Sequence, residues 1–558
     1  MTPSSRHGFS RASALDRLGK ESFDVLVIGG GITGAGVALD AAARGLRTAL
    51  VEREDFASGT SSKSSKLVHG GLRYLAQKEY RLVYENLAER QRLLENAPHL
   101  VRPLPFLIPL FGKGGVVNKT VAKAYRTALW LYDLTGGVRI GKRHKRITPD
   151  QAHAHLPTLN IDLLAAAFLY YDAQADDARL TLALLRTAAD QGAVVANYSP
   201  VASLTKDAAG LVTGARLADG TEIRATTVVN ATGVWVDDIR AMAEDKHPDS
   251  IRPAKGIHIT VPRSKLPCDI AAVVPVPKDR RSIFVVPWGD HTYIGTTDTD
   301  YSGDRDHPEC TADDVDYVIK AINTFFTSPL TVDDVVGTWA GLRPLVKDEA
   351  SERTADLSRR HKVVVSPTGM ITITGGKLTT YRKMAQDTVD AVVDRLDRRV
   401  RRSSTAKLAL RGADGFARLQ ADGAGRTGTE AERFTHLLAR YGTDARTVDA
   451  LIDADAALGS PLIPGLPYLR AEAVYAARYE MAHTLDDILS RRTRALLLER
   501  EATAAAADDV ARLVADDLGW NEDEIARQVA AFREIVRRER DAASTSEPTN
   551  LPEAVGLV

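Results

Sequence analysis

The chain has 558 residues, which is long enough for several domains and a large buried core. Lysine and arginine together number 73, as do aspartate and glutamate, so the net charge of zero excludes a globally basic nucleic-acid-binding protein. Only Cys268 and Cys310 occur, and their separation predicts neither a disulfide framework nor a metal site. No apolar run approaches the roughly 18 residues of a membrane-spanning helix. Any membrane contact is therefore expected to be peripheral.

Residues 1–20 precede the first apolar stretch. They contain no apolar signal-peptide core, so we predict that the chain is not exported and that this segment is disordered. The serine and arginine content gives a weak resemblance to an organelle transit peptide, which is the alternative interpretation.

The stretch Phe23–Asp55 is the strongest local signal. An apolar run ends in Gly29-Gly30-Gly31-Ile32-Thr33-Gly34, a GxGxxG pattern followed by small and apolar residues at helical spacing. Gly29 and Gly31 permit a tight turn and close approach to a pyrophosphate, and Gly34 lets the helix pack closely on the strand. Free N–H groups at the helix N-terminus would face the phosphates. The pattern predicts a strand, a turn and a helix that bind a dinucleotide.

The identity of this dinucleotide stays open on these residues alone. A second strand, 48–51, ends at Glu52, the distance at which an acidic side chain meets a ribose hydroxyl. Because a carboxylate would repel a ribose 2′-phosphate, NADP is disfavoured, and both NAD and the ADP half of FAD remain. An ordinary βαβ turn without a ligand is the alternative.

A loop rich in small hydroxyl residues follows at 59–66 and continues through 67–74. A backbone that passes close to a ligand ring or phosphate needs small residues, and serine hydroxyls can donate or accept hydrogen bonds there. We therefore interpret this segment as a ligand loop rather than a flexible connection. A helix is expected from Gln77 to Asn96, before Pro98.

Two further small-residue turns occur at strand ends. Ala231-Thr232-Gly233 follows an apolar strand, and Gly375-Gly376-Lys377 opens a helix that is expected to reach about Leu396. Ligands of open α/β sheets bind at such places. One pyrophosphate needs only one glycine turn, so the additional turns and the serine loop favour FAD, with its isoalloxazine ring, over NAD.

A second sheet is interleaved with these nucleotide-binding parts. Its expected strands could form the walls of a substrate cavity. The substrate-binding segments are expected at about 100–172 and 252–334, within an FAD-binding domain that spans 21–400. From about Thr405 the composition and periodicity predict a separate all-helical domain over 405–541, followed by a disordered tail over 542–558.

Two basic segments, Lys142–Arg146 and Arg395–Arg402, interrupt the otherwise balanced charge. A solvated face or linker is the usual explanation for such segments, and contact with a membrane surface is the alternative.

Seven motifs, in order along the chain, together resemble FAD-dependent glycerol-3-phosphate dehydrogenase. They are the N-terminal GxGxxG, SSKLVHGGLRYL at 64–75, VVNATGVW at 228–235, KGIHI at 255–259, IGTTDTDY at 294–301, GLRPL at 341–345 and TGGKLTTYR at 374–382. LDDILSRRTR at 485–494 extends the resemblance more loosely. The implied fold is α/β: a Rossmann-like FAD-binding domain interleaved with an antiparallel-sheet substrate domain, as in D-amino-acid oxidase and glutathione reductase, plus a C-terminal all-helical domain.

The resemblance implies oxidation of sn-glycerol 3-phosphate to dihydroxyacetone phosphate by hydride transfer to flavin N5, with electrons passed to a membrane quinone. It also implies a cytoplasmic enzyme, commonly a homodimer, that is peripherally associated with the inner face of the cell membrane. A glycerol-3-phosphate oxidase, which uses oxygen and produces hydrogen peroxide, is the alternative. An amine or amino-acid oxidase would instead bind a carboxylate, and a non-catalytic flavoprotein would act as a binding or scaffold module.

The resemblance also assigns the substrate-binding residues. The phosphate and glycerol groups would meet Arg73, Tyr74, His258, Arg343, Arg359 and Lys377. Arginine suits a phosphate dianion because its planar guanidinium binds in a bidentate manner.

Three catalytic roles are expected of these residues. His258 is the best single candidate for the base that accepts the hydroxyl proton, because histidine titrates near working pH. Arg73 or Arg343 could instead stabilise a developing alkoxide. Lys377 and the helix after it could stabilise the negative charge of reduced flavin.

The predicted cofactor-binding residues come from the segments described above. They are Gly29, Gly31, Ile32, Thr33, Gly34, Glu52, Arg53, Thr60, Ser61, Ser62, Ser64, Ser65, Lys66, Leu67, His69, Gly70, Gly71, Ala231, Thr232, Gly233, Gly376, Lys377, Leu378 and Thr379.

Overall fold

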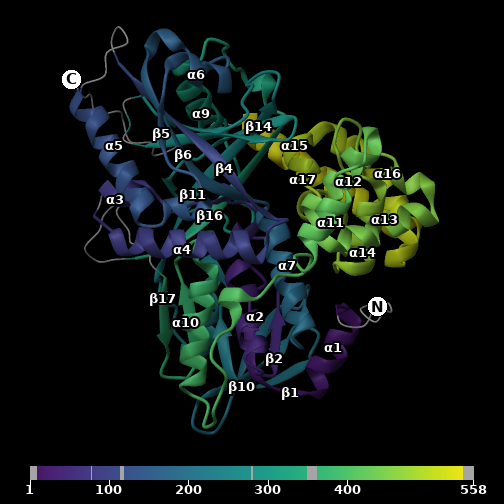
Figure 1. Ribbon diagram of the computed structural model, residues 1–558. Helices are drawn as coiled ribbons and strands as arrows, with labels where there is room; N and C mark the ends of the chain where they lie inside the picture. The colour runs from purple at the N-terminus through teal and green to yellow at the C-terminus, as the bar shows by residue number, and fades with distance from the viewer. Residues whose placement is uncertain are drawn as a thin grey trace.

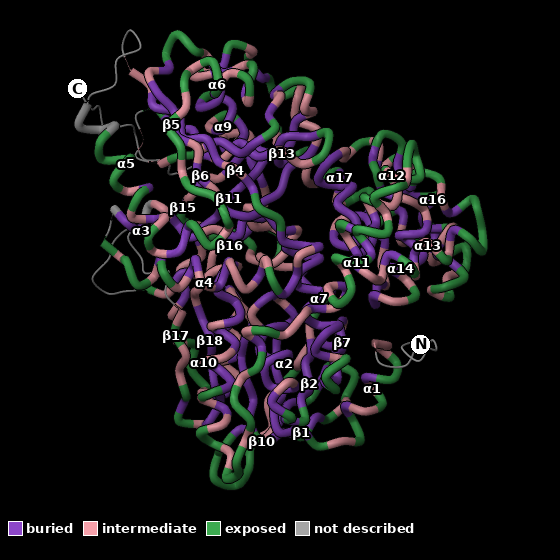
Figure 2. The backbone as a smooth tube through the Cα atoms, viewed as in Figure 1, coloured by how far each residue is buried: buried purple, intermediate pink, exposed green. Residues whose placement is uncertain are grey.

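The computed structural model describes residues 9–76, 78–112, 119–277, 279, 281–347 and 361–544. Figure 1 shows three parts: a lower α/β part around β1 and β2, an upper part built on a second sheet, and a group of C-terminal helices beside them. The chain passes repeatedly between the lower and upper parts, so these two are interleaved in sequence as expected. Figure 2 shows buried backbone running through all three parts.

The lower part contains a sheet with a parallel centre. β1 (Ser22–Ile28) pairs in parallel with β2 (Thr48–Val51) on one side and with β10 (Glu222–Asn230) on the other. Further strands are β7 (Val194–Ala196) next to β2, β18 (Ile371–Thr374) and β17 (Lys362–Val365) beyond β10, and the antiparallel pair β8 (Val201–Lys206) and β9 (Val212–Leu217). Because β1 is central and buried on both faces, its second half, Val25–Ile28, is entirely apolar. The glycine turn therefore lies at the carboxyl end of the central strands.

Helices pack on this sheet and on each other. α2 (Ile32–Ala43) contacts both α7 (Asp177–Asp190) and α10 (Tyr381–Val393). Close packing depends on Gly36, where a Cβ atom would lie 2.8 Å from the ring of Tyr381. α8 (Val236–Glu244) follows the second glycine turn.

The N-terminal segment differs from the expectation of disorder over residues 1–20. Residues 11–20 form helix α1 (Arg11–Lys20), which buries Ala14 and Leu18. Arg11 donates to the carbonyl oxygens of Asn197 and Tyr198 at 2.9 and 2.8 Å. Two buried apolar side chains give a weak periodic signal, so the helix is fixed by tertiary contacts that the sequence does not reveal. Residues 1–8 lie outside the described residues.

The upper part contains a second, largely antiparallel sheet. Its strands are β4 (Val101–Phe111), β6 (Leu164–Ala175), β11 (Ile251–Pro262), β12 (Ala271–Pro275), β13 (Ser282–Trp288), β14 (His291–Gly295) and β16 (Gly337–Val346), with short edge strands β3 (Leu67–Val68), β5 (Lys145–Ile147) and β15 (Thr299–Asp300). β11 is flanked by β14 and β16. The substrate sheet therefore extends past the expected limit of residue 334.

Helices cover the outside of this second sheet. α3 (Arg73–Ala76) and α5 (Lys119–Leu134) lie at the left side of the view, α6 (Pro149–His155) and α9 (Ala312–Phe325) lie at its top, and α4 (Tyr80–Asn96) runs across the middle, between the upper and lower parts (Figure 1). The helix expected to begin at Gln77 begins at Tyr80. Within the described ranges, no helix is long and apolar enough to cross a membrane.

The C-terminal part is helical. It comprises α11 (Phe416–Asp422), α12 (Gly428–Tyr441), α13 (Ala445–Ala454), α14 (Arg470–Tyr479), α15 (Ala495–Leu498), α16 (Arg500–Leu518) and α17 (Glu522–Ser544). A π-helical turn, Asp487–Arg492, separates α14 from α15. α17 continues to Ser544, two residues into the predicted tail, and residues 545–558 lie outside the described part of the chain.

Candidate active site

The glycine turn after β1 is packed too tightly for side chains. A Cβ atom on Gly34 would lie 1.9 Å from the carbonyl oxygen of Gly29, and one on Gly29 would lie 2.7 Å from that of Ala231. Gly29 also has a φ of 112°, in the region that favours glycine. Gly31 is the N-cap of α2 and supplies no side-chain cap; in the first helical turn the amide of Ile32 donates to Ser61 Oγ at 2.8 Å. This cradle fits the pyrophosphate of FAD.

Glu52 lies directly beside this turn. Its Oε2 accepts a hydrogen bond from the amide of Gly30 at 2.6 Å, and Oε1 accepts one from the amide of Glu54 at 3.0 Å. Burial raises the pKa of the Glu52 carboxyl, and the two amide donors partly oppose this rise. The position at the carboxyl end of β2 is the one from which an acid would reach the adenosine ribose.

The turn after β10 has the expected small residues, and their polar groups form hydrogen bonds with neighbouring protein groups. Thr232 Oγ1 donates to Asn230 Oδ1 at 2.7 Å, and the amide of Ala231 donates to the carbonyl of Ile28 at 2.9 Å. Gly233 has a φ of 61°. These contacts hold the ends of β10 and β1 together next to the glycine turn.

Arg53 was predicted as a cofactor ligand, and its guanidinium engages protein groups. Nη2 donates to Asp306 Oδ1 at 2.7 Å, and the guanidinium carbon lies 5.1 Å from the ring centroid of Trp235. Trp235 Nε1 donates to the same carboxylate oxygen at 2.7 Å. The guanidinium of Arg53 therefore has a carboxylate and an indole as partners within the protein.

The serine loop connects the dinucleotide helix to the second sheet. Ser61 Oγ accepts a hydrogen bond from the amide of Ile32 at 2.8 Å, and Thr60 Oγ1 donates to the carbonyl of Leu342 in β16 at 2.6 Å. A Cβ atom on Gly341 would lie 2.5 Å from the loop backbone. The loop can therefore lie flat on the sheet only because this position is glycine.

His258 lies on the face of β11 that the loop covers. It pairs with Gly295 of β14 and with Trp339 of β16, and a Cβ atom on Gly295 would lie 2.3 Å from the imidazole. The imidazole stacks on the Trp339 indole with ring centroids 4.7 Å apart. Nε2 lies 2.9 Å from Ser65 Oγ, and Nδ1 has no hydrogen-bond partner within the described ranges.

The surroundings of His258 favour its neutral form. Burial lowers its pKa well below the usual range, and the positive charges of Lys66 and Arg343 lower it further. A neutral imidazole keeps a lone pair on one ring nitrogen that can accept the substrate proton, although the lowered pKa differs from the expected titration near working pH and makes the protonated form less stable. The geometry is that of a positioned base.

Arg343 shares this face of the sheet. Its guanidinium covers Gly256, where a Cβ atom would lie 2.4 Å from Nη2. Nη1 donates to Asp298 Oδ1 at 2.9 Å, and Nη2 donates to Thr296 Oγ1 at 3.0 Å. Because Asp298 offsets much of its charge, Arg343 would need a second cation to hold a phosphate dianion.

Lys377 and Tyr74, both predicted to meet substrate, are neighbours. Lys377 Nζ lies 4.1 Å from the ring centroid of Tyr74. Thr379 Oγ1 accepts a hydrogen bond from the amide of His69 at 3.2 Å. Gly376, with a φ of 78°, begins this turn, and Leu378 opens the short helix after it. One segment, residues 60–74, thus touches the dinucleotide helix, the strand of His258 and the third glycine turn.

Ser64 and Lys66 direct their side chains to a carboxylate. Asp177, the first residue of α7, accepts hydrogen bonds from the amide and hydroxyl of Ser64 at 3.0 and 2.7 Å, and from Lys66 Nζ at 3.0 Å. Lys66 Nζ also donates to the carbonyl of Ser62 at 2.9 Å. Burial lowers the pKa of Lys66 to about 8, although Asp177 favours its charged form. Both side chains hold the loop in shape.

The remaining predicted residues continue this segment. Leu67 pairs with Gln174 in the second sheet, and the amide of Gly70 donates to Asp172 Oδ1 at 3.1 Å. Gly71 has a φ of 77°. Arg73 begins α3, but its side chain lies outside the described part of the structure, as does all of Arg359.

Sequence reasoning missed Asp177, Trp339 and Arg494. Arg494 Nη2 donates to Asp176 Oδ1 at 2.7 Å and also bonds Asp177. Arg494 directly precedes the buried apolar run Ala495–Leu498 in the sequence. A charged side chain in such a surrounding is almost always paired, and this was the signal available in the sequence.

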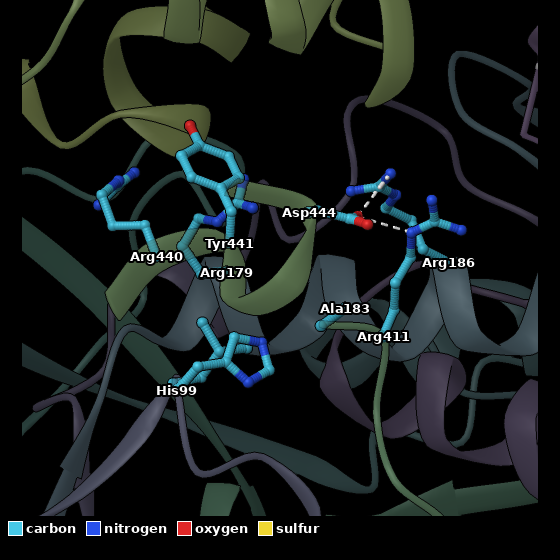
Figure 3. Close-up of a pocket in the computed structure, with 9 residues that line it drawn as sticks. His99, Arg179, Ala183, Arg186, Arg411, Arg440, Tyr441 and Asp444 are labelled. Atoms are coloured by element: carbon cyan, nitrogen blue, oxygen red, sulfur yellow. Dashed lines mark hydrogen bonds and ion pairs between the residues drawn. The ribbon is translucent and has the colours of Figure 1, made fainter. Parts of the chain in front are cut away.

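A separate polar cavity lies between the FAD-binding part and the C-terminal helices (Figure 3). Asp444 there pairs with Arg186 at 3.1 Å and with Arg411 at 2.7 Å. The cavity is lined by His99, Leu100, Arg179, Ala183, Arg186, Arg411, Arg440, Tyr441 and Asp444. None of these is a predicted site residue, and the paired charges join the two parts of the molecule.

Comparison with protein families agrees with this division of the chain. Residues 24–382 match the family described as FAD dependent oxidoreductase. Residues 403–525 match the family described as the C-terminal domain of alpha-glycerophosphate oxidase. The first match covers more than half of the chain and includes every predicted site residue.

Similar proteins extend over almost the whole chain. The glycerol-3-phosphate dehydrogenase of Mycobacterium leprae (strain TN) is 44% identical over 552 residues, covering 97% of this chain and 92% of that protein. The mitochondrial glycerol-3-phosphate dehydrogenase of Homo sapiens is 39% identical, covering 98% and 77%. The crystal structure of the Bacillus halodurans enzyme of the same name, complexed with FAD, has a TM-score of 0.77 at 34% identity, covering 97% and 100%. The chain belongs to the FAD-dependent glycerol-3-phosphate dehydrogenase family.

Proposed function

We propose that this protein oxidises sn-glycerol 3-phosphate to dihydroxyacetone phosphate and passes the electrons to a membrane quinone. Family membership supports the substrate. The single observation that carries the proposal is the neutral His258 beside Arg343 on one sheet face, under the loop that leads from the dinucleotide turn. FAD, when bound, supplies the acceptor for the hydride that leaves the secondary carbinol carbon.

His258 takes the proton of the substrate hydroxyl in this proposal. The Trp339 stack and the Ser65 hydrogen bond fix the ring, so a proton acceptor is in place before substrate arrives. Nδ1, which has no hydrogen-bond partner within the described residues, is the nitrogen that we assign to hold this proton. Burial under the loop also excludes water from the imidazole.

The phosphate is assigned to cations around this base. Arg343 supplies planar donors, and its own charge is shared with Asp298. Lys377 adds an ammonium group next to Tyr74. The resemblance adds Arg73 and Arg359, and their contribution stays a prediction.

An exposed surface on α5 supports the membrane part of the proposal. Trp130 and Leu134 are spaced by one helical turn and are 58% and 61% exposed. Exposed Arg126 precedes them by a turn, and the basic segment Lys142–Arg146 follows. Aromatic and apolar side chains flanked by cations are typical of helices that lie in an anionic membrane surface. We propose that this surface holds the enzyme, as a homodimer, on the cytoplasmic face of the cell membrane.

The decisive experiment is anaerobic reduction of the bound flavin. We expect glycerol 3-phosphate to bleach the purified flavoprotein within seconds, and glycine, proline and glycerol to leave it oxidised. Bleaching by an amino acid, or by no polyol phosphate, would overturn the substrate assignment.

The electron acceptor needs a second measurement, because the C-terminal family match is named for an oxidase. The reduced protein is mixed in turn with air-saturated buffer and with a short-chain quinone in anaerobic buffer. Fast reoxidation by quinone with little hydrogen peroxide supports the dehydrogenase. Fast peroxide formation would assign the protein as a glycerol-3-phosphate oxidase.

A further inference from the structure

We propose that Arg494 of the C-terminal helical domain is a positioning residue for the active site, acting through Asp177 on the loop that orients His258. This inference rests on the proposed function only for the reaction that His258 serves. It gives the helical domain a role in catalysis as well as in stability.

The first step is a buried ionic cluster at the N-terminal end of α7. Asp177 Oδ2 accepts from Ser64 of the loop, and Asp177 Oδ1 accepts from both Lys66 of the loop and Arg494. Asp177, Lys66 and Arg494 are 0%, 2% and 1% exposed. Asp176 also accepts from Arg494 and lies 3.7 Å from Arg440, which itself pairs with Glu472, so each carboxylate of the cluster has at least two cationic partners. Removing one partner of such a cluster leaves an uncompensated buried charge.

The second step leads from the loop to the base. Ser65 Oγ lies 2.9 Å from His258 Nε2, and the carbonyl of Ser64 accepts from Trp339 Nε1 at 3.2 Å. Lys66 Nζ lies 4.9 Å from the ring centroid of Trp339, which stacks on the imidazole. Consecutive loop residues therefore contact either the imidazole or the indole that supports it.

The loop cannot hold the backbone conformation at Lys66 by itself. Lys66 has a φ of 55°, a conformation that L residues rarely adopt, so surrounding contacts must impose it. Asp177 is the carboxylate that bonds the Lys66 ammonium, and Arg494 is the cation that bonds the same oxygen, Oδ1. The order of the loop thus depends on a residue that belongs to another domain.

A matched control exists at the other end of the same helix. Arg411, also from the C-terminal region, pairs with Asp190, the last residue of α7, at 3.0 Å, and with Asp444 at 2.7 Å. Arg411→Gln removes an ion pair between the same two parts of the molecule without touching the loop. Comparison of Arg494→Gln with Arg411→Gln separates a local effect on the site from a general weakening of the domain contact.

The experiment uses the full-length flavoprotein. For Arg494→Gln we expect at least a tenfold fall in the rate of flavin reduction by glycerol 3-phosphate and an altered visible circular dichroism of the bound flavin. For Arg411→Gln we expect a rate within twofold of the parent and an unchanged spectrum. Arg494→Lys, which keeps the charge but loses the two-pronged contact, should recover part of the rate.

The pH profile adds a readout that a merely structural role would not move. The charged or polar groups facing His258 are Lys66, Arg343, Ser65 and the Tyr293 ring. When the loop loosens, the imidazole loses the neighbouring ammonium and part of its burial. The acid limb of kcat/KM should then move up towards the ordinary histidine value of about 6.5.

Equal effects of Arg494→Gln and Arg411→Gln on rate, spectrum and pH profile would overturn the inference. If Arg494→Gln does not fold, Arg494→Lys is compared with Arg411→Gln instead. Equal rates, spectra and pH profiles of these two variants would also overturn the inference. If the parent protein is not reduced by glycerol 3-phosphate, the proposed function fails. The circular dichroism comparison, which needs no substrate, then decides the inference alone.

Discussion

The imidazole of His258 lies nearly parallel to the indole of Trp339, with 9° between the ring planes. Trp339 is itself held by a hydrogen bond from its Nε1 to the carbonyl of Ser64. With Gly295 on its other flank, the imidazole has little freedom to rotate. A base with a fixed orientation loses little entropy when it meets the hydroxyl proton.

Replacement of this base should slow catalysis more than binding. We expect His258→Gln to lower the rate of flavin reduction by about 10² to 10⁴, with a smaller change in KM, as measured by anaerobic stopped-flow spectroscopy. His291→Gln is the control, since His291 is a buried histidine of β14 that pairs with Glu499. Near-normal turnover of His258→Gln with an unchanged pH profile would rule out the base role.

Lys377 should make the flavin easier to reduce. Reduction adds negative charge to the flavin, and a nearby ammonium at the start of the helix that leads into α10 stabilises this charge. We expect Lys377→Met to lower the midpoint potential by about 20 to 40 mV, the equivalent of about 1 to 2 kcal/mol. The measurement is a dye-coupled reductive titration.

The control for this titration is Lys383→Met, which removes a lysine from α10 that pairs with Asp387. Its midpoint potential should equal that of the parent. A Lys377→Met protein with an unchanged potential would remove the proposed role of this lysine.

The glycine turn should not tolerate a methyl group. In Gly34→Ala the new Cβ atom would meet the carbonyl of Gly29 at 1.9 Å, so α2 would have to move away from β1. We expect loss of FAD and a fall in stability of several kcal/mol, measured by the flavin-to-protein absorbance ratio and by urea unfolding. Gly19→Ala, in α1, where the Cβ atom would find ordinary contact at 3.6 Å, should bind FAD normally.

The α5 surface should control membrane binding. We expect Trp130→Glu combined with Leu134→Glu to reduce flotation with anionic liposomes at least tenfold, because two apolar anchors are lost and two repulsive charges added. The control is Val332→Glu, which adds a charge at an exposed apolar side chain in η7 (Val332–Asp334), outside α5. Equal flotation of all three proteins would remove α5 as the membrane contact.

His99 should make the folded protein sensitive to mild acid. Burial, together with the positive charge of Arg179, lowers its pKa to about 4. Between about pH 6.5 and pH 4 the unfolded chain binds a proton at this site that the folded chain does not. Stability therefore falls as pH decreases through this window, by up to about 1.4 kcal/mol per pH unit.

His99→Gln should flatten this dependence. Thermal unfolding is followed at pH 7, 6, 5 and 4 for the parent and the variant. The Tm difference between them should shift in favour of the variant as the pH falls. A constant difference across the series would show that His99 does not contribute to acid sensitivity.

Local patterns were sufficient for the dinucleotide end of the site. The strand, turn and helix around Gly29 to Gly34 and the acid at Glu52 depend on residues close together in the sequence, so spacing alone predicts them. The interleaved second sheet was also predicted, because its strands have clear apolar runs.

Side-chain roles in the loop were not predictable in the same way. Ser64 and Lys66 have the chemistry of ligand-binding residues, yet both bond Asp177, 113 and 111 positions later. Arg343 is predicted as a phosphate ligand, and the structure adds a pairing with Asp298 that the sequence did not indicate. Such pairings form between residues that the tertiary fold brings together, and a local pattern of residue types does not predict them.

The separation between Asp55 and Arg492 has a consequence for how the protein is made. Asp55 lies just after Glu52, is fully buried, and bonds both Arg491 and Arg492, the latter 437 positions later. This carboxylate therefore gains its paired cations, Arg491 and Arg492, only after residue 492 has been synthesised. The FAD-binding part thus depends, for a buried charge beside its dinucleotide turn, on a segment of the helical domain 437 positions later, so the folding of one part requires the other.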